Sequence, residues 1–331
     1  MGQAIQGIVS PLVSQGALPG DAWFAALDAL RPGKPLAIRG SIAGGADGTV
    51  DIAMYRESLQ RYAAHGHTVY AVLEASIGRQ AGMNPNDVLR PEGQCATNNW
   101  IESYSLTCCD TLLKLGDAAP TNLILFNEAN IVVPHLAPGD AIPADKPEAL
   151  SPQVAAAATW LTATRIRSLC PAVQNIYPAA MSDLVKFQTS VSDEWLGGWV
   201  TEQFQYLQSL GLSAPWPFGG LLVNQEGNPN LAYEQYIFYG LSHLKSTFGL
   251  TGPTLITEWG DGVPPQSPAD VAAITASFTA MNSLAYAMFF FTAGFYENYG
   301  TWQVGVSNGE LVPGTQTPWV PLLQSLYQGT I

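Results

Sequence analysis

The sequence predicts a (β/α)8 barrel, an α/β fold in which eight parallel strands form a closed ring inside a layer of helices. Short apolar segments alternate with amphipathic segments along the whole chain, which is the pattern of buried parallel strands and their crossover helices. The length of 331 residues suits this architecture. No glycine-rich fingerprint follows the first apolar segment, which disfavours a doubly wound open sheet. We expect one catalytic domain over residues 1–331.

The expected strands are apolar on both faces and rich in β-branched or aromatic residues. In chain order they are residues 4–10, 35–42, 67–75, 122–128, 175–181, 218–225, 254–259 and 286–293. Helix starts are predicted at the capping residues Asp51, Ser151 and Ser267, because such side chains accept hydrogen bonds from free N–H groups at a helix start. Proline follows both serines and suits the first helical position.

Long segments follow the third, fourth and eighth strands, at residues 76–98, 131–151 and 294–318. They are rich in Pro, Gly, Asn and Trp and contain no charge runs. In a barrel of this kind, the loops at the carboxyl ends of the strands form the functional site. We therefore expect these three loops to shape a substrate cleft.

The charge balance excludes several classes of partner. The formal net charge is −13 and only 12% of the residues are charged, so neither nucleic acid nor an anionic membrane surface is an expected partner. No run of 18 apolar residues is present, which disfavours a membrane span. The first residues lack the features of a signal peptide. We expect an extracellular protein if a leader has been removed and a cytoplasmic one otherwise; the oligomeric state stays open.

Four cysteines, Cys95, Cys108, Cys109 and Cys170, match no zinc-binding spacing. Two interpretations remain equally open for them. They are buried thiols, or one disulfide joins the third and fourth helical segments.

Two glutamates end apolar strands and are the candidate catalytic pair. Glu128 follows the run Leu123–Phe126, and Glu258 follows Thr254–Thr257. A charge at the end of an apolar strand is costly unless it is solvated, paired or used. Because neighbouring like charges raise one pKa, two such carboxyls can take opposite acid and base roles at one pH.

Other polar or aromatic side chains lie at the same strand ends or in the following loops. A helix cap or loop ion pair is the simpler explanation for Glu74, Asp183 or Glu226 taken alone. Aromatic loop residues, Trp100 among them, are candidates to stack on sugar faces. The predicted substrate-binding residues are Arg39, Glu74, Asn127, Asn224, Gln225, Trp259, Tyr296 and Trp302.

The motifs "LFNEAN" and "LITEWG", on the fourth and seventh strands of an eightfold pattern, resemble the signature of clan A glycoside hydrolases, which include families 5 and 39. The resemblance implies Glu128 as acid/base, Glu258 as nucleophile and Asn127 bound to the sugar 2-hydroxyl. It also places Arg39 near the nucleophile. The tail Trp302 to Pro313 is similar to the ending of several such barrels. The implied function is retaining hydrolysis of a β-linked glycan or oligosaccharide, without metal or cofactor.

The chain departs from the clan pattern at three places. Ala129 stands where the clan often has proline, and Asn224 and Gln225 stand where many members have Tyr or His. After the eighth strand, Phe291, Phe295 and Tyr296 replace a Trp platform. These departures leave the sugar, the linkage and endo or exo action open.

Two rival functions remain. Glu74, Glu128 and Asp183 end three consecutive strands, where enolase-type barrels hold magnesium. Such sites also need a Lys or His base at a strand end, and none is expected there. The other rival is a barrel that binds glycans without cleaving them.

Overall fold

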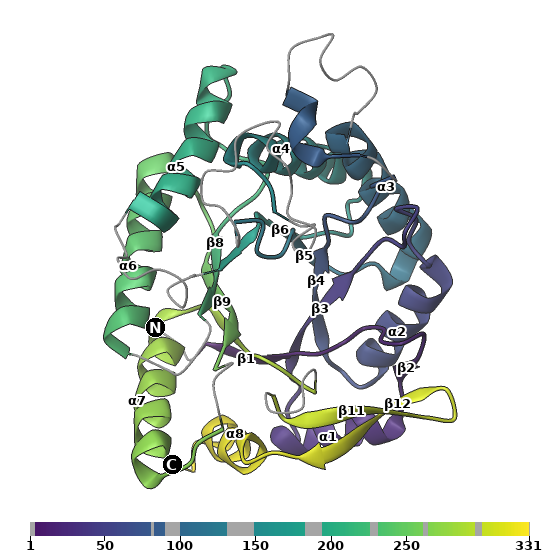
Figure 1. The fold of residues 1–331 in the computed structure, drawn as a ribbon, viewed down its shortest axis with the longest axis vertical. Helices are drawn as coiled ribbons and strands as arrows, with labels where there is room; N and C mark the ends of the chain where they lie inside the picture. Colours follow the sequence, from purple (N-terminus) through teal and green to yellow (C-terminus); the bar gives the residue numbers. More distant parts are fainter. Residues whose placement is uncertain are drawn as a thin grey trace.

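The computed structural model describes residues 4–80, 83–89, 100–130, 149–182, 194–225, 231–260, 264–294 and 300–330. The predicted barrel is confirmed: a ring of parallel strands lies inside a layer of helices (Figure 1). The sheet order is β6-β5-β4-β3-β1-β10-β9-β8-β7. Its strands are β1 (Ile5–Val9), β3 (Ala37–Ile42), β4 (Thr68–Leu73), β5 (Asn122–Leu125), β6 (Asn175–Tyr177), β7 (Ala180–Ser182), β8 (Leu221–Gln225), β9 (Thr254–Trp259) and β10 (Ala287–Phe290).

The fifth predicted strand is divided into two short strands. β6 pairs with β5, whereas β7 pairs with β8, so the two ends of the sheet order belong to one continuous segment and the ring closes. Pro178 lies between them; it has no N–H to donate to a ladder and is therefore poorly suited to the middle of a strand. The single expected strand over 175–181 is corrected accordingly.

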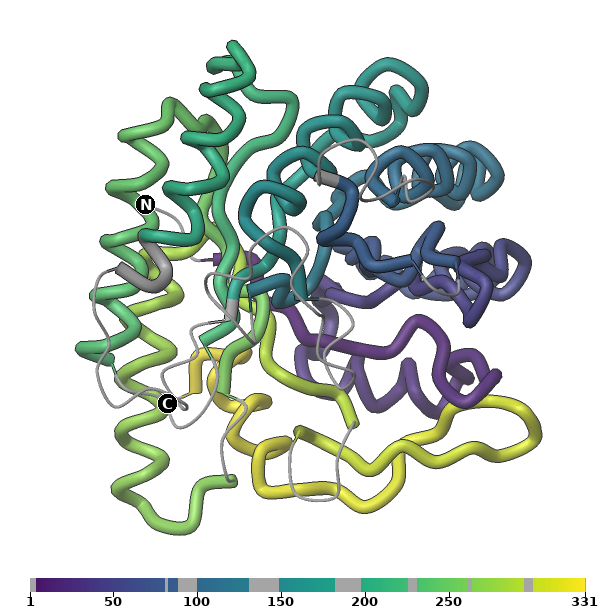
Figure 2. Tube along the Cα trace, turned by 45° about the horizontal axis from the view of Figure 1, so that its top comes forward, coloured from purple at the N-terminus to yellow at the C-terminus, as the bar shows by residue number. Residues whose placement is uncertain are grey.

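The helices surround the strands in chain order, as Figure 2 shows from a second direction. They are α1 (Asp21–Leu30), α2 (Ile52–Ala64), α3 (Trp100–Leu115), α4 (Pro152–Leu169), α5 (Glu194–Ser209), α6 (Leu231–Phe248), α7 (Pro268–Leu284) and α8 (Trp319–Gln328), with 3-10 turns at Pro85–Leu89 and Gly116–Ala118. The three predicted capping side chains, Asp51, Ser151 and Ser267, each accept a hydrogen bond from the first turn of the helix. Within the described residues, no helix is long and apolar enough to span a membrane.

A small second sheet replaces part of the loop expected over residues 294–318. β11 (Trp302–Ser307) and β12 (Glu310–Gln316) form an antiparallel hairpin, and β12 also pairs with β2 (Leu18–Pro19). Asn308 and Gly309 connect the two strands with φ values of 52° and 79°. Positive φ at both central residues is what a tight hairpin turn requires, and Asn-Gly adopts it readily.

Aromatic and aliphatic side chains fill the interior of the barrel. Tyr70 packs edge-on against Phe289 with ring centroids 5.1 Å apart, and it stacks on Tyr177 at 6.3 Å. Aliphatic side chains, including Val72, Ile124, Leu222 and Leu255, complete this cluster. The barrel interior is therefore a packed core, which leaves the carboxyl ends of the strands as the place for polar groups.

The described cysteines are free thiols. Cys108, Cys109 and Cys170 are buried and unpaired, and burial raises the pKa of Cys109 to about 11. A disulfide between Cys109 and Cys170 is therefore not present, which favours the buried-thiol interpretation for these three residues. Cys95 lies outside the described residues.

Candidate active site

The backbone kinks on both sides of Asn127, immediately after β5. Phe126 and Glu128 have φ values of 72° and 45°, a left-handed conformation that non-glycine residues adopt rarely. The kink is held in place because Glu128 N donates to Ala180 O at 2.7 Å and Ala180 N donates to Phe126 O at 3.2 Å. Strained backbone of this kind is concentrated at functional sites, which makes the end of β5 a candidate functional site.

A β-bulge in β9 sets the direction of Glu258. Val223 pairs with Ile256 and Asn224 pairs with Glu258, so Thr257 is an extra residue in this ladder. Such an insertion interrupts the alternation of side chains between the two faces of a strand. Both Thr257 and Glu258 consequently contact side chains at the mouth of the barrel: Asn224 and Arg39, respectively.

Arg39, from β3, forms the centre of the site. Its Nη1 lies 2.7 Å from Glu258 Oε1, and the two side chains are 3% and 4% exposed. Its Nη2 donates a hydrogen bond to Asn127 Oδ1. A guanidinium this close favours the ionised form of Glu258, and the planar fork of arginine lets one side chain hold two partners.

Asn224 connects Asn127 to Glu128. Its Nδ2 lies 3.2 Å from Asn127 Oδ1 and 3.1 Å from Glu128 Oε1. Together with Arg39, it completes a chain of polar contacts from Glu258 to Glu128. The structure thus brings together the two predicted catalytic glutamates and the predicted residues Arg39, Asn127 and Asn224.

Glu74 supplies a third carboxylate at the end of β4. It is half-buried, and its Oε1 accepts a hydrogen bond from Ser41 Oγ at 2.5 Å. Tyr55 lies close enough for its pKa to be raised, by burial first and by the negative charge of Glu74 to a smaller degree. Ser41 and Tyr55 were not among the predicted site residues.

Gln225 and Trp259 differ from their predicted role. The two residues are paired in adjacent strands, are 3% and 1% exposed, and both bind Glu234 of α6. Gln225 Nε2 lies 3.1 Å from the Glu234 carbonyl oxygen, and Trp259 Nε1 lies 3.2 Å from its Oε1. Both side chains therefore pack in the layer between strands and helices, because their strand neighbours Asn224 and Glu258 occupy the inward face.

The described tryptophans of the predicted aromatic set are packing residues. Trp302 is 6% exposed and lies edge-on to Trp23 with centroids 6.3 Å apart. Trp100 is fully buried and stacks on Tyr104 at 5.1 Å. Both rings are buried in the packing of the barrel wall. The other strand-end candidates, Tyr296, Asp183, Glu226, Glu297 and Asn298, lie outside the described residues.

The metal-binding alternative gains no support within the described part of the chain. There, no group of three or more His, Cys, Asp or Glu side chains could hold a metal ion. Glu74 is bound to Ser41, and Glu128 is bound to Asn224. The third predicted ligand, Asp183, lies outside that part of the chain.

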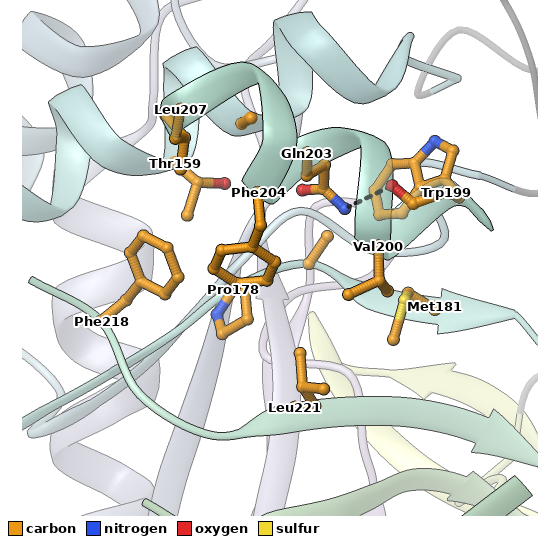
Figure 3. Close-up of a pocket in the computed structure, with 12 residues that line it drawn as sticks. Thr159, Pro178, Met181, Trp199, Val200, Gln203, Phe204, Leu207, Phe218 and Leu221 are labelled. Atoms are coloured by element: carbon orange, nitrogen blue, oxygen red, sulfur yellow. Dashed lines mark hydrogen bonds between the residues drawn. The ribbon is translucent and has the colours of Figure 1, made fainter. Parts of the chain in front are cut away.

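A separate apolar pocket lies under α5, and no carboxylate lines it (Figure 3). Its volume is about 10 Å³, and Phe204, Phe218, Leu221 and Met181 are among the residues that line it. A space of that size holds at most about one water molecule. It is therefore a packing defect between helix and barrel rather than a substrate site.

The fold and the site define a (β/α)8 barrel with two glutamates, joined through arginine and asparagine side chains, at the carboxyl ends of its strands. No family model matches the chain. No curated protein matches it in sequence either.

Several solved structures are similar in fold. Endo-glycoceramidase II from Rhodococcus sp., described as a lactosyl-enzyme intermediate, is 12% identical with a TM-score of 0.54 over 97% of this chain and 78% of its own. A fungal β-1,4-galactanase is 14% identical with a TM-score of 0.54 over 99% of both chains. A GH30 endoxylanase from Clostridium papyrosolvens C71 is 13% identical with a TM-score of 0.56 over 99% of this chain and 72% of its own. The predicted resemblance in fold to glycoside hydrolase barrels is confirmed.

Proposed function

We propose that this protein is a retaining β-glycoside hydrolase, with Glu258 as nucleophile and Glu128 as acid/base. Its substrate is a β-linked glycan or oligosaccharide. The observation that carries the proposal is the unequal environment of the two glutamates. Glu258 is buried against the guanidinium of Arg39, whereas Glu128 is half-buried and accepts an amide N–H from Asn224.

This inequality suits the two steps of retention. In the first step, the Glu258 carboxylate attacks the anomeric carbon while Glu128 gives its proton to the departing glycosidic oxygen. The C–O bond to the leaving group breaks, and an ester forms between the sugar and Glu258. In the second step, Glu128 takes a proton from water, the water oxygen attacks the anomeric carbon, and Glu258 leaves as a carboxylate.

Asn127 is oriented to bind the sugar. Its Oδ1 already accepts hydrogen bonds from Arg39 and Asn224, so its Nδ2 is the atom left to face the 2-hydroxyl of a bound sugar. The resemblance of the sequence motif implies the same role for Asn127. Glu74, which Ser41 fixes at the end of β4, supplies an acceptor for another sugar hydroxyl. Tyr296 remains a predicted substrate contact.

The similar structures support the reaction class. The Rhodococcus protein is described with a lactosyl group on the enzyme, which is the kind of covalent intermediate that retention requires. The other two are described as a β-1,4-galactanase and an endoxylanase. All three act on sugars, which agrees with a carbohydrate substrate for this chain.

Azide rescue tests the roles of the two glutamates. Glu258→Ala should lose turnover while keeping its fold, and added azide should restore cleavage with a glycosyl azide of inverted configuration, because the small anion fills the space of the missing carboxylate. Glu128→Ala with azide should give the retained azide instead, because Glu258 still forms the intermediate. Retained product from Glu258→Ala would reverse the assignment, and full activity in both variants would overturn the proposal.

A further inference from the structure

Thr257 lies one residue before the proposed nucleophile and has no direct role in the reaction described above. The bulge in β9 turns its side chain toward β8. Thr257 Oγ1 lies 2.7 Å from Asn224 Oδ1 and 3.1 Å from the carbonyl oxygen of Val223. Thr257 and Asn224 are both 0% exposed, so water does not replace either contact.

The Thr257 hydroxyl has one hydrogen and two acceptors within reach, so two hydrogen-bond networks are conceivable. In the first, Thr257 donates to Asn224 Oδ1 and the Asn224 Nδ2 faces Glu128 and Asn127. In the second, Thr257 donates to the carbonyl oxygen of Val223, and the Asn224 amide is reversed. Its Nδ2 then donates to Thr257 Oγ1, and its Oδ1 faces Glu128 Oε1 and Asn127 Oδ1. The shorter 2.7 Å contact is the usual distance for an O–H···O bond.

The second network conflicts with the rest of the site. Asn127 Oδ1 already receives the Arg39 hydrogen bond, which fixes it as an acceptor. A reversed Asn224 amide would place its oxygen 3.2 Å from that acceptor and 3.1 Å from Glu128 Oε1. In the first network each of these contacts joins a donor to an acceptor, so it is the one that the site selects.

The orientation of Asn224 has a consequence for the proton on Glu128. When Oε1 accepts the Asn224 N–H, the proton of the neutral carboxyl is carried by Oε2, where a leaving group receives it. With a reversed amide, Oε1 would have to carry the proton in order to bind Asn224 Oδ1. The proton would then be held by the protein instead of the glycosidic oxygen.

We propose that the Thr257 hydroxyl is a positioning group that, together with the Arg39–Asn127 hydrogen bond, holds the Asn224 amide with its Nδ2 on Glu128 Oε1 and thereby keeps the catalytic proton on Oε2. The inference rests on the proposed acid/base role of Glu128. The charged groups at the neighbouring strand ends within the described residues are Arg39 on β3, Glu74 after β4 and Glu258 on β9. All of them stay unchanged when Thr257 is replaced.

The test uses three substitutions at Thr257 and one control. Thr257→Val keeps the shape and removes the hydroxyl, Thr257→Ser keeps the hydroxyl, and Thr257→Cys supplies a weaker donor. Thr254, a residue that is 5% exposed at the start of the same strand, pairs with Leu221 rather than Asn224; Thr254→Val removes its hydroxyl and is the matched control for general effects on β9.

The first readout is the pKa of Glu128, measured by carbon NMR on protein labelled at the glutamate carboxyl carbon, with the signal assigned by its loss in Glu128→Gln. We expect Thr257→Val to raise this pKa by about half a unit to one unit, because the ionised carboxylate loses a well-oriented hydrogen bond from the Asn224 amide. Thr257→Cys should give a smaller rise in the pKa of Glu128. If Thr257→Val does not fold, the pKa is measured in Thr257→Cys instead. Thr257→Ser and Thr254→Val should stay at the wild-type value. An unchanged pKa in both Thr257→Val and Thr257→Cys overturns the inference.

The second readout separates positioning from general damage. Thr257→Val should lose roughly tenfold more kcat on an aryl β-glycoside with a poor leaving group than on one with a good leaving group, and Thr257→Ser should recover that loss. Equal losses on both substrates would overturn the positioning role. If Thr257→Val shifts the pKa as expected but the wild-type protein cleaves no β-glycoside, then the Thr257–Asn224 contact holds and the proposed function is what fails.

Discussion

Arg39 Nη1 lies 2.7 Å from Glu258 Oε1, and the two side chains are almost completely buried. Arg39 also donates to Asn127, so one side chain links the nucleophile strand to the acid/base strand. A buried ion pair of this kind is costly to break, because removal of one partner leaves an uncompensated charge.

Arg39→Met should destabilise the fold by about 3–5 kcal/mol, since it leaves the Glu258 carboxylate buried without its cation. Arg39→Lys should fold, but a point charge cannot hold Glu258 and Asn127 together as a planar fork does. We expect kcat to fall by about 100-fold or more. Urea unfolding and steady-state kinetics measure the two effects.

Arg61 provides the control for Arg39. It forms ion pairs with Glu57 at 2.7 Å and with Glu310 at 2.9 Å, but its side chain is 31% exposed. Arg61→Met should change the free energy of unfolding by about 1 kcal/mol or less, because solvent screens exposed pairs. Equal losses in the two arginine variants would contradict the special role of Arg39.

Glu128→Ala should spare substrates whose leaving groups need no proton. With a dinitrophenyl glycoside, the first step needs little acid assistance, so formation of the covalent intermediate should be nearly as fast as in the wild-type protein. With a poorer leaving group, this step should slow by about 100-fold or more. Pre-steady-state release of the phenol measures the first step directly; a uniform loss across leaving groups would speak against an acid role.

Glu234 offers a prediction about stability and pH. It is 3% exposed on the buried face of α6, and burial raises its pKa above the ordinary value of 4.5, although hydrogen bonds from Ser277 and Trp259 oppose the shift. A raised pKa in the folded state means that protonation stabilises the fold. That contribution is fully present below pH 4.5 and is lost as the pH rises through the folded pKa.

Glu234→Gln is neutral at every pH, so it should unfold at higher urea than the wild-type protein at pH 7. The difference should shrink as the pH falls toward 4.5. Glu234→Leu should instead lose about 1–3 kcal/mol, because Trp259 N–H and Ser277 O–H are left without an acceptor. If the difference in urea unfolding between the wild-type protein and Glu234→Gln stays constant with pH, burial does not raise the pKa of Glu234.

The sequence predicted those site residues whose positions depend only on the geometry of parallel strands. Glu128 follows β5, Asn224 and Glu258 are the penultimate residues of β8 and β9, and Arg39 lies within β3; the closed parallel barrel brings these side chains together. Gln225 and Trp259 lie against Glu234 instead, because each directly follows an inward-facing residue. The alternation of side chains along a strand sends the second of two neighbours to the outer layer.

Other features follow from details that apolar patterns do not contain. Thr257 faces the site only because β9 has a bulge, and strict alternation would place it on the opposite face from Glu258. Glu234 looks like an ordinary acidic residue in the first turn of a helix, and only the packing of α6 buries it. The hairpin of β11 and β12, in contrast, had an available signal in Asn308-Gly309 between alternating residues.

The role of Glu258 as nucleophile is tested most directly by the mass of the intact protein after incubation with a panel of 2-deoxy-2-fluoro β-glycosyl fluorides, followed by peptide mapping. The fluorine slows both steps, while the fluoride leaves without acid assistance, so the glycosyl-enzyme accumulates. We predict a single glycosyl adduct on Glu258, with the reactive sugar identifying the preferred glycone, and none in Glu258→Ala. An adduct on another carboxylate, or cleavage of a β-glycoside with inversion and no adduct, would contradict the account.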